Sequence, residues 1–220
     1  GPARLAVAWM LRDATTPDAA LARIAAWLAV DAVRESALLE TLVAEEAARL
    51  EDSGRREEAV AAWRRLFAQR PYPQNSRWDD GHMAVARMLR RGGDARGAVA
   101  ALDEMLSVRD PACSGGSCDA PHFQEGAMLR GEILRDDVGD LAAAARAYRS
   151  TYEMFSTSRV RDDALRAEAL VRERIGDGSA CDVWERLGRE FPCTRPGREG
   201  RAHAATCGRV VPPPGRDDCD

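Results

Sequence analysis

The apolar residues of this 220-residue chain recur at intervals of three and four positions, the spacing of one face of an α-helix. Val60, Trp63, Leu66 and Phe67 form one such stripe, and a second lies within residues 85–89. Side chains of this size on one face are typical of amphipathic helices that pack on a core. Four tryptophans fall on such helices and are expected to pack between them: Trp9, Trp27, Trp63 and Trp184.

A recurring break interrupts the helical pattern. Each copy has a glycine, a few polar residues and then an Ala-rich amphipathic run, and the copies begin at Gly54, Gly93, Gly139 and Gly176. Glycine accepts the left-handed conformation that ends many helices. A small residue five positions later lets the second helix pack closely on the first. Each break therefore predicts a helix–turn–helix.

The same register extends to the N-terminus, where Thr15-Thr16-Pro17 forms a degenerate copy with proline at the first helical position. Small residues at the expected packing positions, Ala20, Ala59, Ala98, Ala144 and Cys181, are separated by 39, 39, 46 and 37 residues. The longest interval contains an insertion, and repeat proteins tolerate such loops between repeats. We therefore expect five repeats, at about 3–33, 38–71, 79–110, 122–157 and 161–192, with a Cys-containing loop at 111–121, a capping helix at about 198–208 and a Pro-rich tail at 209–220.

Composition supports a folded helical protein and excludes some functions. Ala and Leu dominate, aromatic residues are 5% and hydrophobic residues 45%, so helix formers are abundant and strand formers are scarce. The net charge of −4 argues against nucleic acid as a partner, because phosphate binding needs a basic excess. The sequence has no apolar run long enough for a membrane span. Gly1-Pro2 looks like the remnant of a cleaved tag, so a signal or a lipid-attachment cysteine could have stood upstream.

Two junctions between the expected repeats carry a family resemblance. Residues 70–80 read Arg-Pro-Tyr-Pro-Gln-Asn-Ser-Arg-Trp-Asp-Asp, and residues 155–164 read Phe-Ser-Thr-Ser-Arg-Val-Arg-Asp-Asp-Ala. Both resemble the joints of tetratricopeptide (TPR) proteins, in particular the Gram-negative envelope group that includes the β-barrel-assembly lipoprotein and the Tol-Pal-associated periplasmic coordinator. The resemblance covers residues 3–208. It implies an all-α, right-handed superhelical α-solenoid of about five TPR-like repeats.

The resemblance also implies a function. It predicts a non-catalytic scaffold, periplasmic or associated with the outer membrane, that binds a peptide or helix of another protein in a concave groove. The first helix of each repeat would line this groove, and its mixture of Arg and Met suits an acidic or amphipathic segment. A simpler interpretation, that these are ordinary exposed positions of an Arg-rich protein, stays open. The expected groove residues are Met83, Arg87, Arg90, Arg91, Glu125, Met128, Glu132, Arg135 and Arg166.

Six cysteines lie in the C-terminal half, and an even number favours disulfides. If antiparallel helices turn near residue 195, Cys181 and Cys207 face each other. Cys181 and Cys193 on one continuous helix would be about 18 Å apart, too far for a bridge. We therefore predict three disulfides, the last two of which fasten the final helix and the tail: Cys113–Cys118, Cys181–Cys207 and Cys193–Cys219.

A zinc site is the chemical alternative. Cys113, Cys118 and His122 lie close in the sequence, as do His203 and Cys207, but no pair of CxxC motifs is present. Motifs for hydrolases, phosphate binding and dinucleotide binding are also missing from the sequence. We expect no catalytic residue, metal or cofactor. Two alternatives remain, a cytoplasmic TPR adaptor with reduced or zinc-bound cysteines and an accessory domain of a larger enzyme.

Overall fold

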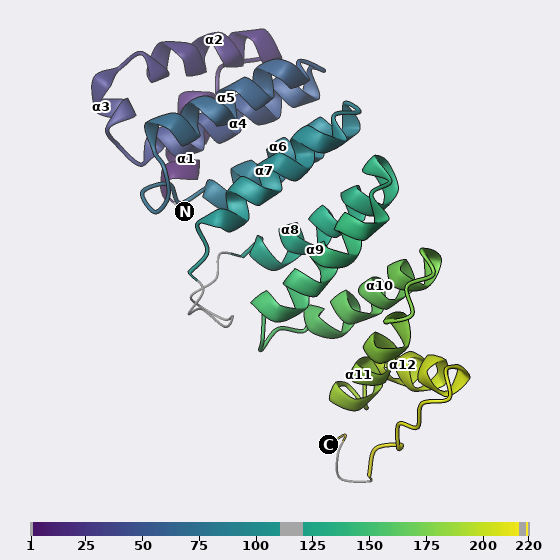
Figure 1. The fold of residues 1–220 in the computed structure, drawn as a ribbon. Coiled ribbons are helices and arrows are strands. Elements are labelled where there is room, and N and C mark those ends of the chain that lie inside the picture. The colour runs from purple at the N-terminus through teal and green to yellow at the C-terminus, as the bar shows by residue number, and fades with distance from the viewer. Residues whose placement is uncertain (1, 111–120, 216–218, 220) are drawn as a thin grey trace. The chain divides into compact units, whose positions relative to one another are not determined.

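The computed structural model describes residues 2–110, 121–215 and 219. These residues form twelve α-helices and one short π-helix, with no strand among them (Figure 1). The fold class is all-α, as the hydrophobic pattern predicts. The chain divides into two compact units, one ending at Gly92 and one beginning at Gly93.

The first compact unit is built around an apolar cluster shared by its first four helices. Its helices are α1 (Pro2–Met10), α2 (Pro17–Leu28), α3 (Asp31–Arg34), α4 (Leu38–Asp52), α5 (Arg56–Gln69) and α6 (Trp78–Arg91). The cluster joins Val7 and Met10 of α1, and Leu11 directly after it, to Ile24 of α2 and Leu42 of α4. Burial of these side chains holds the first helix pair on α4.

In the second compact unit each helix packs on the next one in the chain. Its helices are α7 (Ala95–Ser107), α8 (Phe123–Ile133), the π-helix η2 (Leu134–Val138), α9 (Leu141–Met154), α10 (Val160–Arg174), α11 (Ala180–Glu190) and α12 (Arg195–Thr206). Buried residues of α10, α11 and α12, with Trp184 at their centre, form one apolar cluster. Tyr148 of α9 and Val171 of α10 belong to another.

The glycine turns are confirmed. Gly54, Gly93, Gly139 and Gly176 have φ angles of 75°, 85°, 76° and 70°, in the left-handed region that favours glycine. The N-terminal turn is confirmed as well, because Thr16 accepts a hydrogen bond from the Ala19 amide at 3.2 Å ahead of a helix that begins at Pro17.

One packing position is different from the prediction. Ala20, Ala59, Ala98 and Ala144 are fully buried, as expected. In the last repeat, however, Ala180 is buried and Cys181 is only half-buried. Ala180 lies four residues before Trp184 and seven before Leu187, so it shares their buried face, whereas Cys181 is turned toward α12.

Two of the four tryptophans are also different from the prediction. Trp63 and Trp184 are buried, but Trp9 and Trp27 are 64% and 37% exposed. Trp9 lies on the side of α1 opposite the shared cluster, where no described helix covers it.

The C-terminal helices begin and end at slightly different residues from those expected. Helix α11 ends at Glu190, so Cys193 lies in the following turn, and α12 begins at Arg195 and not near 198. Pro2, expected to be part of a tag remnant, is the first residue of α1. Most of the expected Cys-containing loop, residues 111–120, lies outside the described residues.

Candidate functional site

A buried carboxylate fixes the first inter-repeat joint to α4. Glu40 accepts hydrogen bonds from Arg70 Nη1 at 3.3 Å and from the Ser76 amide at 3.1 Å, and the Ser76 hydroxyl also donates to it. Arg70 in turn donates to the backbone carbonyls of Arg34 and Ser36 at 3.0 and 2.8 Å. These bonds hold the segment before α6 in place, and with it the side chain of Arg77.

Two adjoining hollows run along α1, α4 and the start of α6, all within the first compact unit. They enclose about 530 and 410 Å³ and share Arg4, Thr41 and Arg77. We refer to them together as the A-face groove, where A stands for the first helix of each helix pair, because these first helices line it. Its residues are Pro2, Ala3, Arg4, Val7, Ala8, Leu11, Ala37, Glu40, Thr41, Ala44, Glu45, Arg49, Ser76, Arg77 and Asp80.

The groove combines an apolar wall with charged side chains that are mostly paired. Arg49 Nε donates to Glu45 at 2.8 Å, and Arg77 Nη1 donates to Asp80 at 3.1 Å. Arg4 is exposed, and within the described part of the chain no hydrogen bond or ion pair engages its guanidinium. Arg4 is therefore a cation available to a carboxylate of a bound segment.

The groove residues expected in the first compact unit all lie on α6. Met83 is 1% exposed and packs inside the unit, so it does not line a surface and this part of the prediction is wrong. Arg87 is exposed and Arg90 is half-buried. Arg91 forms an ion pair with Glu51 of α4.

Several of the groove residues expected in the second compact unit form ion pairs or apolar contacts with nearby residues of the same unit. Arg135 forms an ion pair with Asp136 at 2.7 Å, and Glu125 lies 3.1 Å from His122 Nδ1. Met128 packs against the cluster around Tyr148. Glu132 is half-buried on α8.

Arg166 joins α10 to α12. Its guanidinium donates two hydrogen bonds to Glu199, at 2.7 and 2.9 Å. This direct bond holds the pKa of Glu199 below its usual value and raises the pKa of Arg166. In this structure Arg166 therefore serves the packing of the last helices.

The groove residues expected from the sequence begin at Met83, so Arg4, Thr41 and Arg77 were missed. One signal was present. Arg77 belongs to the quoted joint, and Arg4 lies four residues before Ala8 on one side of an apolar helix. Spacing alone does not show, however, that these side chains meet around a hollow.

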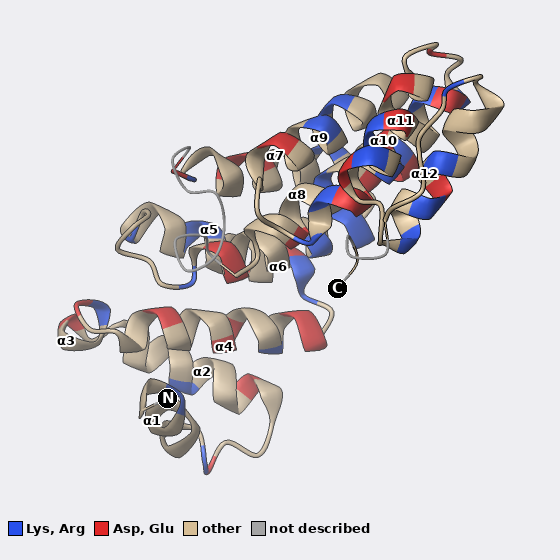
Figure 2. Cartoon of the chain, turned by 90° about the horizontal axis from the view of Figure 1, so that it is seen from below, with Lys and Arg blue, Asp and Glu red and all other residues tan. Residues whose placement is uncertain are grey.

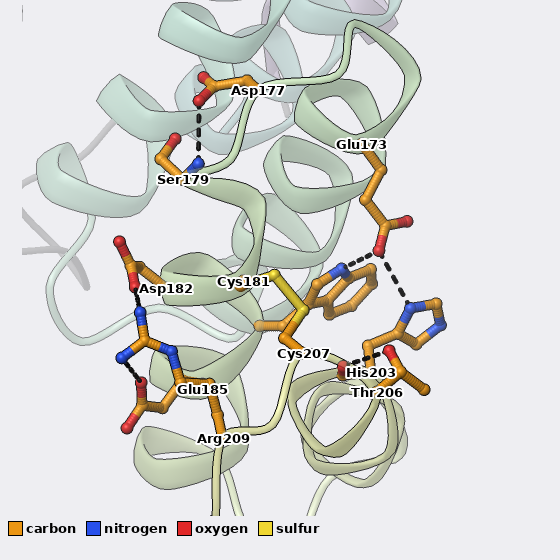
Figure 3. Close-up of a disulfide and its surroundings, with 11 residues drawn as sticks. Glu173, Asp177, Ser179, Cys181, Asp182, Glu185, His203, Thr206, Cys207 and Arg209 are labelled. Carbon is orange, nitrogen blue, oxygen red and sulfur yellow. Dashed lines mark hydrogen bonds and ion pairs between the residues drawn. A yellow bond between two sulfur atoms is a disulfide. The ribbon is translucent and has the colours of Figure 1, made fainter.

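Two disulfides lie at the C-terminal end of the second compact unit. The Cys181 and Cys207 sulfurs are 2.07 Å apart and join α11 to the end of α12 (Figure 3). Cys193 and Cys219 form the other bridge, with Cα atoms 5.4 Å apart. Both pairs are the ones that the sequence predicted. The third predicted pair, Cys113–Cys118, lies outside the described residues.

Beside the first disulfide, Glu173 contacts two aromatic rings. Its Oε1 accepts a hydrogen bond from Trp184 Nε1 at 2.7 Å and lies 3.2 Å from His203 Nδ1, while the two rings stack at 4.2 Å (Figure 3). His203 and Cys207, the C-terminal half of the zinc alternative, are thus engaged with Glu173 and Cys181. Among residues 2–110, 121–215 and 219, no three His, Cys, Asp or Glu side chains form a group that could hold a metal.

None of the helices in the described part of the chain combines the length and the apolar character needed to cross a membrane.

Comparison with known proteins shows the class of fold. No family model and no curated protein matches the sequence. Solved structures do match over nearly the whole chain. The crystal structure of MamA protein is 12% identical, with a TM-score of 0.53, and the match covers 96% of this chain and 98% of that one.

Two other matches point to the same architecture. A Podosopora anserina putative kinesin light chain with nearly identical TPR-like repeats is 14% identical, with a TM-score of 0.55 and coverage of 95% and 96%. A tetratricopeptide repeat protein from Parabacteroides merdae is 14% identical, with a TM-score of 0.51 and coverage of 95% of this chain and 75% of that one. The fold is therefore that of a TPR-like repeat protein.

Proposed function

We propose that the chain is a non-catalytic scaffold that binds an extended segment of another protein in the A-face groove. The observation that carries this proposal is the groove itself, which has an apolar wall beside the exposed Arg4 guanidinium. A segment with an acidic residue next to small apolar ones matches both features. TPR-like repeats support a role in protein binding, because such folds bury partner segments along their first helices.

Photocrosslinking tests this proposal. A photoreactive amino acid placed at Thr41, in the groove, should crosslink to a discrete partner in cells, whereas the same group at the exposed Ala61 of α5 should not. Arg4→Glu should abolish the Thr41 product. A Thr41 product that survives Arg4→Glu, or no product at all, would reject the groove as the binding site.

The part of α6 that carries the exposed Arg87 and the half-buried Arg90 is a second candidate for partner contact, following the resemblance. Arg87→Glu should weaken crosslinking from a group placed at Arg90, on the same helix, without changing helicity. An unchanged yield would remove this surface from consideration.

We further propose that the protein works in an oxidising compartment of a bacterial envelope. Two cysteine pairs at bonding distance support this, because structural disulfides persist mainly in exported proteins. Peptide mapping of protein alkylated directly in cells should recover Cys181 linked to Cys207. Free thiols in that sample would favour the cytoplasmic adaptor.

A further inference from the structure

The C-terminal tail carries a run of prolines between two fixed points. Residues 210–215, after α12, read Val-Val-Pro-Pro-Pro-Gly and lie between Cys207 and Cys219. Cys207 is bonded to Cys181 at the start of α11, and Cys219 is bonded to Cys193 just after the end of the same helix. The two disulfides therefore hold the tail at both ends of α11.

Covalent chemistry restricts the backbone of this tail. The ring of a proline fixes φ at about −65°, and a residue that precedes a proline is confined to extended or polyproline II backbone. Val211, Pro212 and Pro213 each precede a proline, so these restrictions act on consecutive residues. The sequence therefore dictates a polyproline II helix, which has about three residues per turn.

The burial of the tail has the same period of three. Val211 and Pro214 are half-buried, whereas Val210, Pro212 and Pro213 are exposed. Val211 packs against the apolar cluster around Trp184. One edge of the polyproline II helix therefore faces the second compact unit, and the other two edges face water. The exposure of Val210, on one of these outward edges, is 83%.

The backbone and the charge of the tail leave it open to a partner. Within the described part of the chain, no hydrogen bond involves a backbone group of residues 210–214, so their carbonyls can accept hydrogen bonds from another molecule. Arg209, just before them, lies 2.6 Å from Asp182 and 3.8 Å from Glu185. Figure 2 shows dense charges on α10, α11 and α12, whereas residues 210–215 carry none.

A tail that only closed the second disulfide would not need these prolines. Such a linker needs length, and Val211 alone supplies its contact with the apolar cluster. Pro212 and Pro213 are exposed, so burial does not explain them. What they do is stiffen the segment and present its two outward edges.

We propose that residues 210–214 are a binding site for another protein, which contacts them through a groove lined by aromatic side chains. Aromatic rings pack on the rings of a polyproline II segment, and Trp N–H or Tyr O–H groups donate to its carbonyls. Because the prolines and the two disulfides already order the segment, binding costs little conformational entropy. In this contact the chain is itself the ligand.

This site is separate from the A-face groove. The groove lies in the first compact unit and the tail in the second, so the test of one does not depend on the other.

Photocrosslinking from the intact chain in its own cells is the first test. p-Benzoylphenylalanine in place of Val210 should crosslink to a discrete protein, at a peptide that contains Trp or Tyr. The same group in place of Ala202, exposed on α12, should not give this product. Replacing both exposed prolines, as Pro212→Ala with Pro213→Ala, should abolish the Val210 product.

Calorimetric titration with the purified partner gives the second test. Pro212→Ala with Pro213→Ala should weaken binding at least about tenfold, because the ring contacts and the restricted backbone are both lost. Pro17→Ala, at an exposed proline of α2, is the matched control and should leave the affinity unchanged. Circular dichroism and disulfide mapping should show that all variants keep the fold and both bridges.

Four results would overturn the proposal. They are the absence of a Val210 product, a product that joins two copies of this chain, a partner peptide without an aromatic residue, and an affinity that the two proline substitutions leave unchanged.

Discussion

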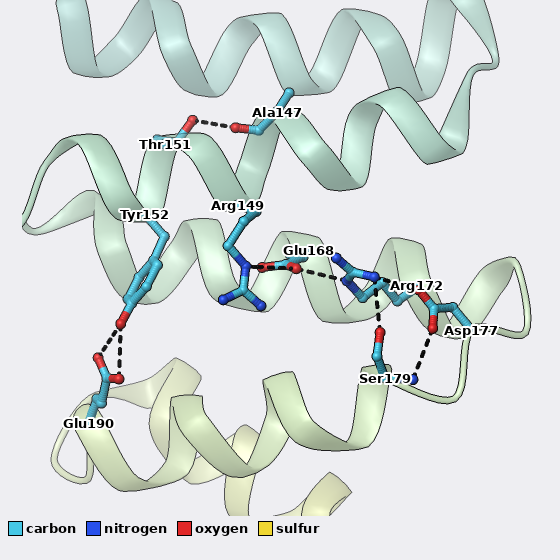
Figure 4. Close-up of polar contacts among 9 residues, drawn as sticks. All are labelled: Ala147, Arg149, Thr151, Tyr152, Glu168, Arg172, Asp177, Ser179 and Glu190. Atoms are coloured by element: carbon cyan, nitrogen blue, oxygen red, sulfur yellow. Dashed lines mark hydrogen bonds and ion pairs between the residues drawn. The ribbon is translucent and has the colours of Figure 1, made fainter.

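The buried carboxylate of Glu168 lies between two arginines and joins α9 to α10. The Glu168 side chain is 0% exposed, and Arg149 Nε lies 2.9 and 3.0 Å from its two oxygens (Figure 4). Arg172 Nε donates to it at 2.7 Å from the same helix. Arg172 also donates to Asp177 and Ser179 at the next turn, so the network reaches the start of α11.

Replacing Glu168 with Gln removes the charge and keeps the shape. Loss of one partner of a buried ion pair costs about 3–5 kcal/mol, because a charge is left without compensation. Here the Arg149 and Arg172 side chains are 24% and 21% exposed, so water can solvate them in part, and Arg172 keeps its other acceptors. We therefore expect Glu168→Gln to lower the free energy of unfolding by about 2 kcal/mol.

Urea denaturation followed by circular dichroism measures this loss. Glu185→Gln is the matched control, because its partners Arg189 and Arg209 are 59% and 48% exposed, so water screens these ion pairs and their loss should cost less than about 1 kcal/mol. The double variant Arg149→Met with Glu168→Leu should recover part of the loss, since it leaves fewer unpaired groups. If Glu168→Gln costs no more than Glu185→Gln, the network does not stabilise the α9–α10 contact.

Two further predictions concern packing and pH. Gly131→Ala should destabilise the protein by about 1–3 kcal/mol, because a Cβ at residue 131 would lie 2.5 Å from the Tyr148 ring. Gly178→Ala is the control and should change the stability little, because a Cβ there would point into open space. Thermal denaturation measures both variants. The pKa of Glu199 is lowered by Arg166, so its stabilisation is present above the unfolded value of 4.5 and is lost as the pH falls through the folded pKa. Wild-type protein should therefore lose more stability between pH 7 and acid than Glu199→Gln, and equal losses would show that the bond contributes nothing.

The features that sequence predicts well are those with a single physical solution. A glycine between two helices is there because the turn needs positive φ, so Gly54 and its counterparts mark the repeats directly. When the turn between two antiparallel helices is known, it determines which of their residues face each other. The turn near residue 195 therefore predicts that Cys181 pairs with Cys207. Such constraints are local, and periodicity is enough to find them.

The wrong predictions arise where two adjacent residues both fit the repeat pattern, or where burial of a residue depends on a contacting element that the sequence does not identify. Ala180 and Cys181 are both small, and only their phase relative to Trp184 decides which is buried. Trp9 has the size of a core residue, but the described helices leave it 64% exposed. The A-face groove depends on how α1, α4 and the start of α6 lie beside one another, and a linear pattern does not contain that.

The arrangement of the two C-terminal disulfides has a consequence for biosynthesis. In chain order the four cysteines are 181, 193, 207 and 219, and the bridges join the first to the third and the second to the fourth. A chain that enters an oxidising compartment from its N-terminus presents Cys181 and Cys193 before their partners Cys207 and Cys219, and these two belong to different bridges. Correct pairing therefore requires α12 to dock before oxidation, or thiol–disulfide exchange to resolve the first bond formed.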